Sequence, residues 1–478
     1  MKIAYFLILN IVWIGFCQAQ SNTFFKTYST SNSVGNSVVC THDNGYAFLG
    51  STYEIYNNSN LYLVKTDEFG DTLWTKIYNM PYLDVGFSIQ ETYDNGFVLA
   101  GQVGEPDTIS IGASDIYMLK TDEFGDTIWT FTTNLGIGDK AYSIRQLIDS
   151  SYVVTGVANE SVNSTNKNSF LLKLDKNGQL LWQHIYENYS SGKSVIQTLD
   201  NGFIVCGQYG LFNNTAVYLI KTNSLGDTIW TKKGGLGFQY GRGEDVVQLF
   251  DSSYIVTGSV YNNSNQDVFV SKIDKNGNLI WTKQYGGNED DYANAIHLVE
   301  DNGFIIAGDT YSYSVGQFYN ADIWLLRFDE NGDTLWSKSY GNTENNQATD
   351  VKSCPDKGFI VTGSSGTTPN AFLLKIDSLG NSPIISSTSI IQEKKGLEFN
   401  IYPNPTSEII TVEFNASLGY SDVVFTIHDY WGRQVKQFKE KKDDNIFQFD
   451  VSSLEKGIYY LTISHDNKIL MTKHFLKQ

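Results

Sequence analysis

Cysteine and proline are scarce in this chain, and the shortage of cysteine limits what can cross-link it. Of 478 residues, only 7 are proline and 4 are cysteine. Cys17 lies in an apolar N-terminal run, which leaves Cys40, Cys206 and Cys354. These three are widely spaced and form no CxxC pair, so neither a disulfide framework nor a zinc site is expected. Cys206 lies in an apolar stretch and is expected to be buried packing.

Positive charge is also in short supply. The chain has 34 Lys and Arg against 52 Asp and Glu, a net charge of −18. From Glu398 onward, 11 acids and 9 bases leave only −2, so nearly all of the negative charge precedes that residue. A surface this acidic repels phosphate backbones, and nucleic acid is therefore not an expected partner.

Long apolar runs are missing except at the N-terminus. Residues 1–19 are typical of a signal peptide, with Lys2, an apolar stretch, and Cys17 and Ala19 at −3 and −1 of a cut before Gln20. A lipoprotein signal at Cys17 is the alternative, but the bulky Phe16 before it is unfavourable. The run is shorter than the ~20 apolar residues of a membrane span. We therefore expect export without a membrane anchor.

Catalytic motifs are missing as well. There is no nucleophile elbow, HExxH motif, Walker loop or EF-hand loop, and the six histidines show no metal-ligand spacing. No cofactor and no metal are expected, and a binding protein is favoured over an enzyme. A glycoside hydrolase or lyase with two channel carboxylates stays open, because sequence alone does not pair acids across a fold.

What the chain does contain is a repeat that occurs seven times. Each repeat has a turn that begins with aspartate and leads into an apolar strand, as in DNGFIIAG. The turns begin at Asp43, Asp94, Asp149, Asp200, Asp251, Asp301 and Asp356. Each is followed by a strand that carries a basic residue, at Lys65, Lys120, Lys173, Lys221, Lys272, Arg327 and Lys375. Nine residues later, six repeats have a tryptophan, at Trp74, Trp129, Trp182, Trp230, Trp281 and Trp336.

A further apolar stretch precedes each aspartate turn, which makes four strands per repeat. The aspartates are 50 to 55 residues apart. This pattern predicts an all-β fold with a seven-bladed β-propeller over residues 20–384. The recurring tryptophans are expected to pack blade against blade. The recurring basic residues are expected to pair internally with carboxylates.

The seventh repeat lacks its tryptophan strand, and the N-terminus offers a substitute. The segment FFKTYS from Phe24 matches WTKIYN from Trp74. We expect it to complete the last blade and to close the ring, which removes two free sheet edges. Cys40 and Cys354 fall in corresponding strands of the first and last blades, which leaves a disulfide between them open.

The repeats vary in some loops and not in others. The aspartate turn and the turn before each tryptophan are constant, and in a four-stranded blade both lie on one face of the disc. The loops on the opposite face vary in length and are expected to carry recognition. Exposed Tyr suits carbohydrate or protein surfaces, although packing of the same rings onto the propeller is equally open. The candidate binding residues are Tyr53, Tyr56, Tyr240, Arg242, Tyr261, Tyr311, Tyr313 and Tyr319.

The unit that runs from Tyr285 as YGGNEDDYANAIHLVEDNGFIIAGDTYS resembles the bacterial seven-bladed propeller repeats abbreviated SBBP. The resemblance implies the fold and leaves the function open.

A short Asp-Thr/Ser-apolar pattern recurs in the chain. It resembles the acceptor of general O-glycosylation in Bacteroidota, and plain turn chemistry is the alternative. The hydroxyl residues concerned are Thr72, Thr108, Thr127, Thr228, Thr334 and Ser378.

The pattern changes after the repeats, where residues 385–397 are expected to be a linker. Residues 398–478 contain alternating strands that predict a small, Ig-like β-sandwich. Within it lie Tyr402, Pro403, Asn404, Pro405, Gly457, Tyr459 and Lys473. In these features the segment resembles the type A C-terminal sorting domain of the type IX secretion system. The resemblance implies the type IX machinery as a partner and a secreted or cell-surface location, with attachment to lipopolysaccharide as one outcome.

Three functions follow for the exported propeller. A non-catalytic module that binds glycan or protein, acting as a monomer, is favoured. A secreted carbohydrate-active enzyme and a structural adhesin are the alternatives.

Overall fold

The computed structural model describes fourteen segments of the chain. They are residues 22–28, 32–54, 58–79, 84–104, 113–159, 167–211, 214–262, 265–315, 320–382, 399–414, 423–429, 434–440, 445–465 and 468–478. The chain divides into two compact units, Met1–Ile390 and Ile391–Gln478. The predicted signal peptide and linker lie outside the described residues. Within the described segments, no helix has the length and apolar character that a membrane crossing requires.

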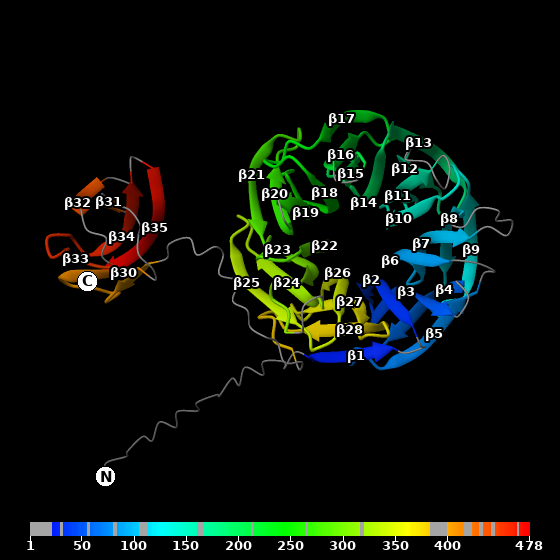
Figure 1. Ribbon diagram of the computed structural model, residues 1–478, viewed down its shortest axis with the longest axis horizontal. Coiled ribbons are helices and arrows are strands. Elements are labelled where there is room, and N and C mark those ends of the chain that lie inside the picture. The colour runs from blue at the N-terminus through cyan, green and yellow to red at the C-terminus, as the bar shows by residue number, and fades with distance from the viewer. Residues whose placement is uncertain are drawn as a thin grey trace, which may run out of the picture. The chain divides into compact units, whose positions relative to one another are not determined.

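Seven four-stranded antiparallel sheets form the first unit, and Figure 1 shows them as blades arranged in a ring. The innermost strands are β2 (Ser33–Cys40), β6 (Val85–Glu91), β10 (Lys140–Gln146), β14 (Ser190–Gln197), β18 (Gly241–Gln248), β22 (Asp291–Leu298) and β26 (Asn346–Ser353). The second strands are β3 (Tyr46–Glu54), β7 (Phe97–Gly104), β11 (Tyr152–Asn159), β15 (Phe203–Tyr209), β19 (Tyr254–Asn262), β23 (Phe304–Thr310) and β27 (Phe359–Ser365).

The remaining strands lie farther from the centre (Figure 1). The third strands are β4 (Asn58–Thr66), β8 (Ser114–Thr121), β12 (Lys167–Leu174), β16 (Ala216–Thr222), β20 (Asn265–Ile273), β24 (Asp322–Phe328) and β28 (Asn370–Ile376). The outermost strands are β5 (Thr72–Tyr78), β9 (Thr127–Thr133), β13 (Leu180–Asn188), β17 (Thr228–Lys233), β21 (Leu279–Tyr285), β25 (Thr334–Tyr340) and β1 (Phe24–Tyr28). We number the blades 1 to 7 from β2. The predicted all-β propeller is confirmed.

The ring is closed by the N-terminal strand, as predicted. Strand β1 pairs antiparallel with β28, with Phe24 opposite Lys375. A Cβ atom on Gly70 would lie 2.5 Å from the Phe24 ring, just as one on Gly125 would lie 3.0 Å from the Trp74 ring. Phe24 therefore takes the tryptophan place in blade 7. The Tyr28 hydroxyl donates to the Gly70 carbonyl at 2.7 Å, which ties blade 7 to blade 1.

The aspartate turns explain why the basic residue recurs. Lys65 Nζ lies 2.8 Å from an Asp43 carboxylate oxygen, and the equivalent pair forms in every blade. Partial burial alone would raise the pKa of Asp43, but hydrogen bonds from Lys65, Thr41 and Gly45 lower it to about 2. Since Lys65 lies next to the turn between β4 and β5, both constant turns occupy one face of the disc. We call this face the constant-turn face.

The middle residues of the aspartate turns show why the motif reads Asp-Asn-Gly. The residue after the aspartate has φ between +63° and +66° in all seven turns, a region that asparagine tolerates. The glycine that follows leaves room for the next strand, because a Cβ on Gly45 would lie 2.2 Å from the Thr66 carbonyl oxygen and 2.7 Å from Lys65 Nζ. Where Ser151 replaces this glycine, the Lys173 side chain is 16 % exposed, against 6 % for Lys65.

Neighbouring blades are also joined near the centre by a recurring hydrogen bond. The Ser88 hydroxyl accepts from the Ile144 backbone N–H of the next blade at 3.3 Å. Asp350 does the same across the closure, where its carboxylate accepts from Val38 N at 3.0 Å. The ring is therefore closed at its centre as well as at its rim.

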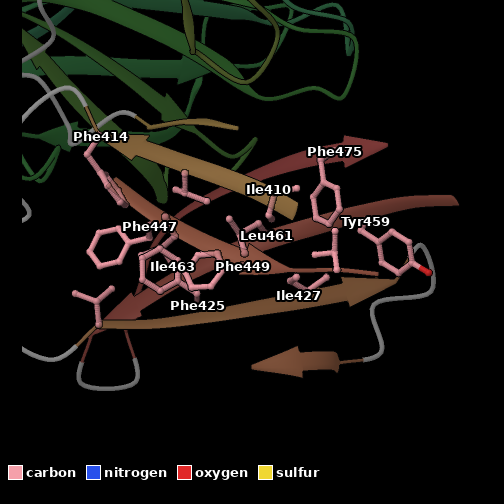
Figure 2. Close-up of a cluster of buried hydrophobic side chains, with 13 residues drawn as sticks. Ile410, Phe414, Phe425, Ile427, Phe447, Phe449, Tyr459, Leu461, Ile463 and Phe475 are labelled. Atoms are coloured by element: carbon pink, nitrogen blue, oxygen red, sulfur yellow. The ribbon is translucent and has the colours of Figure 1, made fainter. Parts of the chain in front are cut away.

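The second unit is a small β-sandwich with its own core. One sheet contains β29 (Phe399–Tyr402), β30 (Ile409–Phe414) and β33 (Ile446–Asp450), and the other contains β31 (Val423–Asp429), β32 (Gln434–Glu440), β34 (Gly457–His465) and β35 (Lys468–Lys477). Figure 2 shows side chains of both sheets meeting in one cluster, among them Ile410, Phe425, Phe447 and Leu461. The predicted small sandwich is confirmed.

Ring closure can be tested at Phe24. Replacing Phe24 with Ala should lower the free energy of unfolding by about 3 kcal/mol, because it removes a buried ring from the contact with Gly70. Phe24→Trp is the control, since it installs the residue that the other six blades have there. Denaturant unfolding of the mature protein measures both. An unchanged midpoint for Phe24→Ala would show that this strand does not close the ring.

Candidate functional site

A cavity of about 620 Å³ lies in the channel between the innermost strands. All seven of these strands contribute to its wall. Each innermost strand has a β-bulge, and the bulged residues form one ring of the wall: Asn36, Phe87, Tyr142, Lys193, Glu244, Asn294 and Thr349. A second ring lies closer to the constant-turn face: Val39, Gln90, Arg145, Ile196, Val247, His297 and Lys352.

The first ring has two parts with different roles. In blades 6, 7 and 1 the side chain donates to a backbone carbonyl of the next blade at 2.7 Å, from Asn294 to Ala348, from Thr349 to Gly35 and from Asn36 to Gly86. These three residues hold blades together.

In blades 2 to 5 the same position contacts other side chains. The rings of Phe87 and Tyr142 lie 5.0 Å apart, and Lys193 Nζ lies 4.2 Å from the centre of the Tyr142 ring. Lys193 Nζ also lies 4.0 Å from one carboxylate oxygen of Glu244, and Arg242 Nε lies 3.1 Å from the other. Burial alone would lower the pKa of Lys193, but Glu244 and Tyr142 raise it, so the amine stays charged. Aromatic and charged groups therefore form a continuous wall on this side of the channel.

The second ring places cations beside apolar groups. Lys352 forms an ion pair with Asp350, and Arg145 donates to the Ile144 carbonyl at 2.8 Å. Burial, together with the nearby Lys352, lowers the pKa of His297 to about 3, so this imidazole is neutral at pH 7. His297 can therefore offer one donor and one acceptor to a ligand.

The channel carboxylates are already engaged with the fold. Asp245 accepts from Ile296 N of the next blade at 3.0 Å, and burial raises its pKa. Burial alone would raise the pKa of Asp350, but Lys352 beside it lowers it. Glu244 has Arg242 and Lys193 as partners. Each of the three acids thus has a structural partner.

The described residues predicted on the variable loops do not line this cavity, although Arg242, which lies in β18, contacts Glu244 of its wall. Tyr313 donates to the Gly286 carbonyl at 2.8 Å and packs on Trp324, so it anchors its loop. Tyr311 lies edge-on to Tyr292. The guanidinium group of Arg242 lies 5.4 Å from the centre of the same Tyr292 ring.

The other predicted residues that the structure describes are Tyr53, Tyr240 and Tyr261. Tyr261 donates its backbone N–H to the Tyr240 carbonyl at 3.2 Å, and Tyr53 is 39 % exposed on blade 1. Tyr56 and Tyr319 lie outside the described residues. Binding at this face stays a prediction.

The residues of the glycosylation pattern differ in accessibility. Thr72, Thr127, Thr228 and Ser378 are exposed, whereas the Thr334 hydroxyl is buried without a hydrogen-bond partner. Thr108 lies outside the described residues. Glycosylation stays a prediction. In the described part of the chain, no group of three His, Cys, Asp or Glu side chains is placed to hold a metal ion.

In the second unit, the YPNP segment contacts the end of the chain. Asn404 Oδ1 accepts from Leu476 N at 2.9 Å, and the Tyr402 hydroxyl donates to Glu413 at 2.9 Å. Pro403 and Pro405 both follow cis peptide bonds. Tyr459 stacks on Phe475 at 5.7 Å and donates to the Glu455 carbonyl.

The other two matching residues belong to the last two strands. Gly457 opens β34, opposite Lys477, and the exposed Lys473 pairs with Leu461 across the same ladder. The fold therefore gathers most of the motif residues around the last strand.

Residues 400–478 match the family described as the secretion system C-terminal sorting domain. The second unit is a type IX sorting domain. The sorting domain implies interaction with the type IX secretion machinery, passage across the outer membrane and delivery to the cell surface. No match was found among curated proteins.

Several solved structures are similar to the chain at low identity. A protein of unknown function from Bacteroides caccae is 11 % identical, with a TM-score of 0.39, over 65 % of this chain and 94 % of its own. Sqt1 from Chaetomium thermophilum, bound to the N-terminus of ribosomal protein L10, is 10 % identical, with a TM-score of 0.46, over 82 % of this chain and 97 % of its own. A puromycin hydrolase is 12 % identical, with a TM-score of 0.48, over 81 % of this chain and 59 % of its own. At such identities the likeness concerns the fold and not the function.

Sequence reasoning missed the channel because its residues are spread over seven repeats. The available signal was variation at a fixed place in the innermost strand, where Phe87, Tyr142, Lys193 and Glu244 differ from one another and from the Asn or Thr of the other three blades. Aligning the repeats by strand position would have found it.

Export by the sorting domain can be tested by truncation. Deleting residues 398–478 should leave the propeller folded in the periplasm, because the two units have separate cores. Fractionation with an antibody against the propeller measures its location. The full-length chain is the control, and surface delivery of the truncated chain would contradict the prediction.

Proposed function

We propose that this exported propeller is a non-catalytic binding protein whose ligand occupies the central channel. The observation that carries the proposal is the contrast between repeated and unrepeated positions. The scaffold pairs recur in all seven blades, and an aromatic ring lies on a turn glycine between every two adjacent blades. The channel wall of blades 2 to 5 has a different residue in each blade.

A feature repeated seven times serves the scaffold, whereas a binding site is specific to one place. In blades 6, 7 and 1 the first-ring position holds blades together, whereas in blades 2 to 5 its side chains contact one another along the cavity wall, where a ligand can reach them. The wall offers two aromatic rings, an ammonium group and a carboxylate, and neutral His297 lies nearby. Such a lining suits a polar ligand with an apolar part, of the kind that glycans and protein segments provide.

Binding without turnover is favoured because the channel acids already hold backbone groups or ion pairs. A carbohydrate-active enzyme or an adhesin with no small ligand would give different results in the same assay. We further propose that the mature protein is monomeric, since copies with this net charge repel each other. Attachment to lipopolysaccharide after sorting is part of the proposal.

The channel can be tested with a glycan array and a peptide array probed with the mature propeller. Any ligand found should bind Lys193→Met and Tyr142→Ser at least tenfold more weakly, because both side chains face the cavity. Leu73→Ser is the matched control, since Leu73 is exposed on an outermost strand.

Two outcomes would contradict the proposal. Turnover of a bound glycan would identify an enzyme. Loss of binding in Tyr53→Ser but not in Lys193→Met would place the ligand on the variable loops.

A further inference from the structure

The constant-turn face carries an exposed apolar crescent around the mouth of the channel. In blades 2 to 5 the residue before the turn aspartate is a large apolar one, and its exposure is high. The four residues are Tyr93 at 62 %, Ile148 at 79 %, Leu199 at 63 % and Phe250 at 85 %. The same place in blades 1, 6 and 7 is occupied by His42, Glu300 and Pro355. The crescent therefore spans the same four blades as the variable channel wall.

The crescent and the cavity form one surface. Leu199 and Phe250 line the cavity as well as the mouth. Their blade neighbours Lys193 and Glu244 lie deeper in the same wall. A ligand that fills the channel would therefore contact the crescent where it emerges.

The crescent is held in place by the backbone. Tyr93 N donates to Gln146 Oε1 of the next blade at 2.9 Å, and Leu199 N donates to Gln248 Oε1 at 2.8 Å. These two turns are thus fixed by the neighbouring blade, and the side chains of Tyr93 and Leu199 are presented on rigid supports. Ordering them on binding costs little conformational entropy.

The chemistry of the crescent favours a protein over a glycan. The side chains of Ile148 and Leu199 offer neither a ring face for a sugar nor a hydrogen bond. Contiguous exposed apolar groups of this kind are typical of protein interaction sites.

The charge of the propeller indicates which protein segment would bind. Nearly all of the net charge of −18 belongs to the chain before Glu398. Farther out on the same face, the turn between the third and fourth strands of blade 2 carries Asp122, Glu123 and Asp126. A second copy of this chain would bring the same acids together and be repelled. A segment with net positive charge would be attracted.

We propose that the partner is a protein segment with apolar side chains and net positive charge. Its apolar groups contact Tyr93, Ile148, Leu199 and Phe250, and one end enters the channel. This assignment rests on the proposed function and specifies its ligand.

Three labelled peptides of equal length test the assignment. One alternates Leu with Lys, one Leu with Glu and one Ser with Lys. Fluorescence anisotropy with the mature propeller should show the Leu/Lys peptide binding about tenfold or more tightly than the other two. Raising the salt concentration should weaken its binding. Equal binding of the Leu/Glu peptide would overturn the assignment of charge.

Variants locate the contact. Leu199→Ser and Phe250→Ser should each weaken Leu/Lys binding about tenfold. Both side chains are exposed, so neither change should unfold the protein, which thermal unfolding verifies. Ile280→Ser is the control, because Ile280 is 54 % exposed on the outermost strand of blade 5. Unchanged binding in Phe250→Ser would overturn the proposal.

The failure of this inference is distinguishable from failure of the proposed function. A glycan that depends on Lys193 and not on Phe250 would overturn the protein partner and leave channel binding intact. Binding of the Leu/Lys peptide that depends on Phe250 and not on Lys193 would support the crescent and contradict a ligand in the channel.

An independent observation concerns the seam between the last blade and the first. The Sγ atoms of Cys40 and Cys354 lie 3.0 Å apart. Cys40 is the last residue of β2, and Cys354 lies in the turn after β26. These residues are 314 positions apart in the chain. In the neighbouring seam the equivalent strand position, Glu91, instead accepts a hydrogen bond from His42 N at 3.0 Å. The cysteine pair thus replaces a polar contact at the seam between blades 7 and 1. The inner strands that meet there, β26 and β2, come from opposite ends of the repeat region.

We infer that Cys40 and Cys354 form a disulfide once the chain is exported. The two thiols lose two protons and two electrons as the S–S bond forms. A periplasmic thiol-disulfide oxidoreductase takes both electrons, and its own disulfide is reduced to two thiols. An approach of about 1 Å between the sulfurs completes the bond.

Alkylation of the secreted protein under denaturing, non-reducing conditions tests the bond. Only Cys206 should react before reduction, and Cys40 and Cys354 should react after it. Cys40→Ser should lower the melting temperature, whereas reduction should lower it in the parent protein and not in the variant. Cys206→Ala is the control that keeps the bond. Three reactive thiols in the unreduced secreted protein would overturn the inference.

Discussion

Each blade of this protein depends on the next through an aromatic ring that lies on a turn glycine. The Trp74 ring lies against Gly125, and the Trp129 ring lies against Gly178. A four-stranded sheet alone has two uncovered faces, so a blade becomes stable only when its neighbours cover it. The contact therefore has to be made seven times, and the last one needs an aromatic ring from outside the run of repeats. Phe24 supplies it, and the whole ring depends on that strand.

The repeated features could be predicted from the sequence because each is local and occurs many times. The pairing of Lys65 with Asp43 follows from two residues at a fixed place in every repeat. The closing strand could be found because FFKTYS keeps the spacing of WTKIYN, including the tyrosine that reaches the turn carbonyl.

The site could not be predicted in the same way. Phe87, Tyr142, Lys193 and Glu244 are about fifty residues apart along the chain, and only the closed ring brings them to one wall. The loops that vary in length lie on the opposite face. Variation at a constant turn, as in Tyr93 and Phe250, leaves the length of the turn unchanged and is not visible in the spacing of the repeats.

Closure and export impose an order on folding. Strand β1 pairs with β28, so the ring cannot close until nearly all of the repeat region is available. The sorting domain has a separate hydrophobic core around Phe425 and Leu461, so its folding does not require a closed ring. Recognition by the secretion machinery and completion of the propeller are therefore separate events in one chain. A bond between Cys40 and Cys354 would stabilise the completed propeller and leave the sorting domain unaffected, because both sulfurs belong to the seam that closes last.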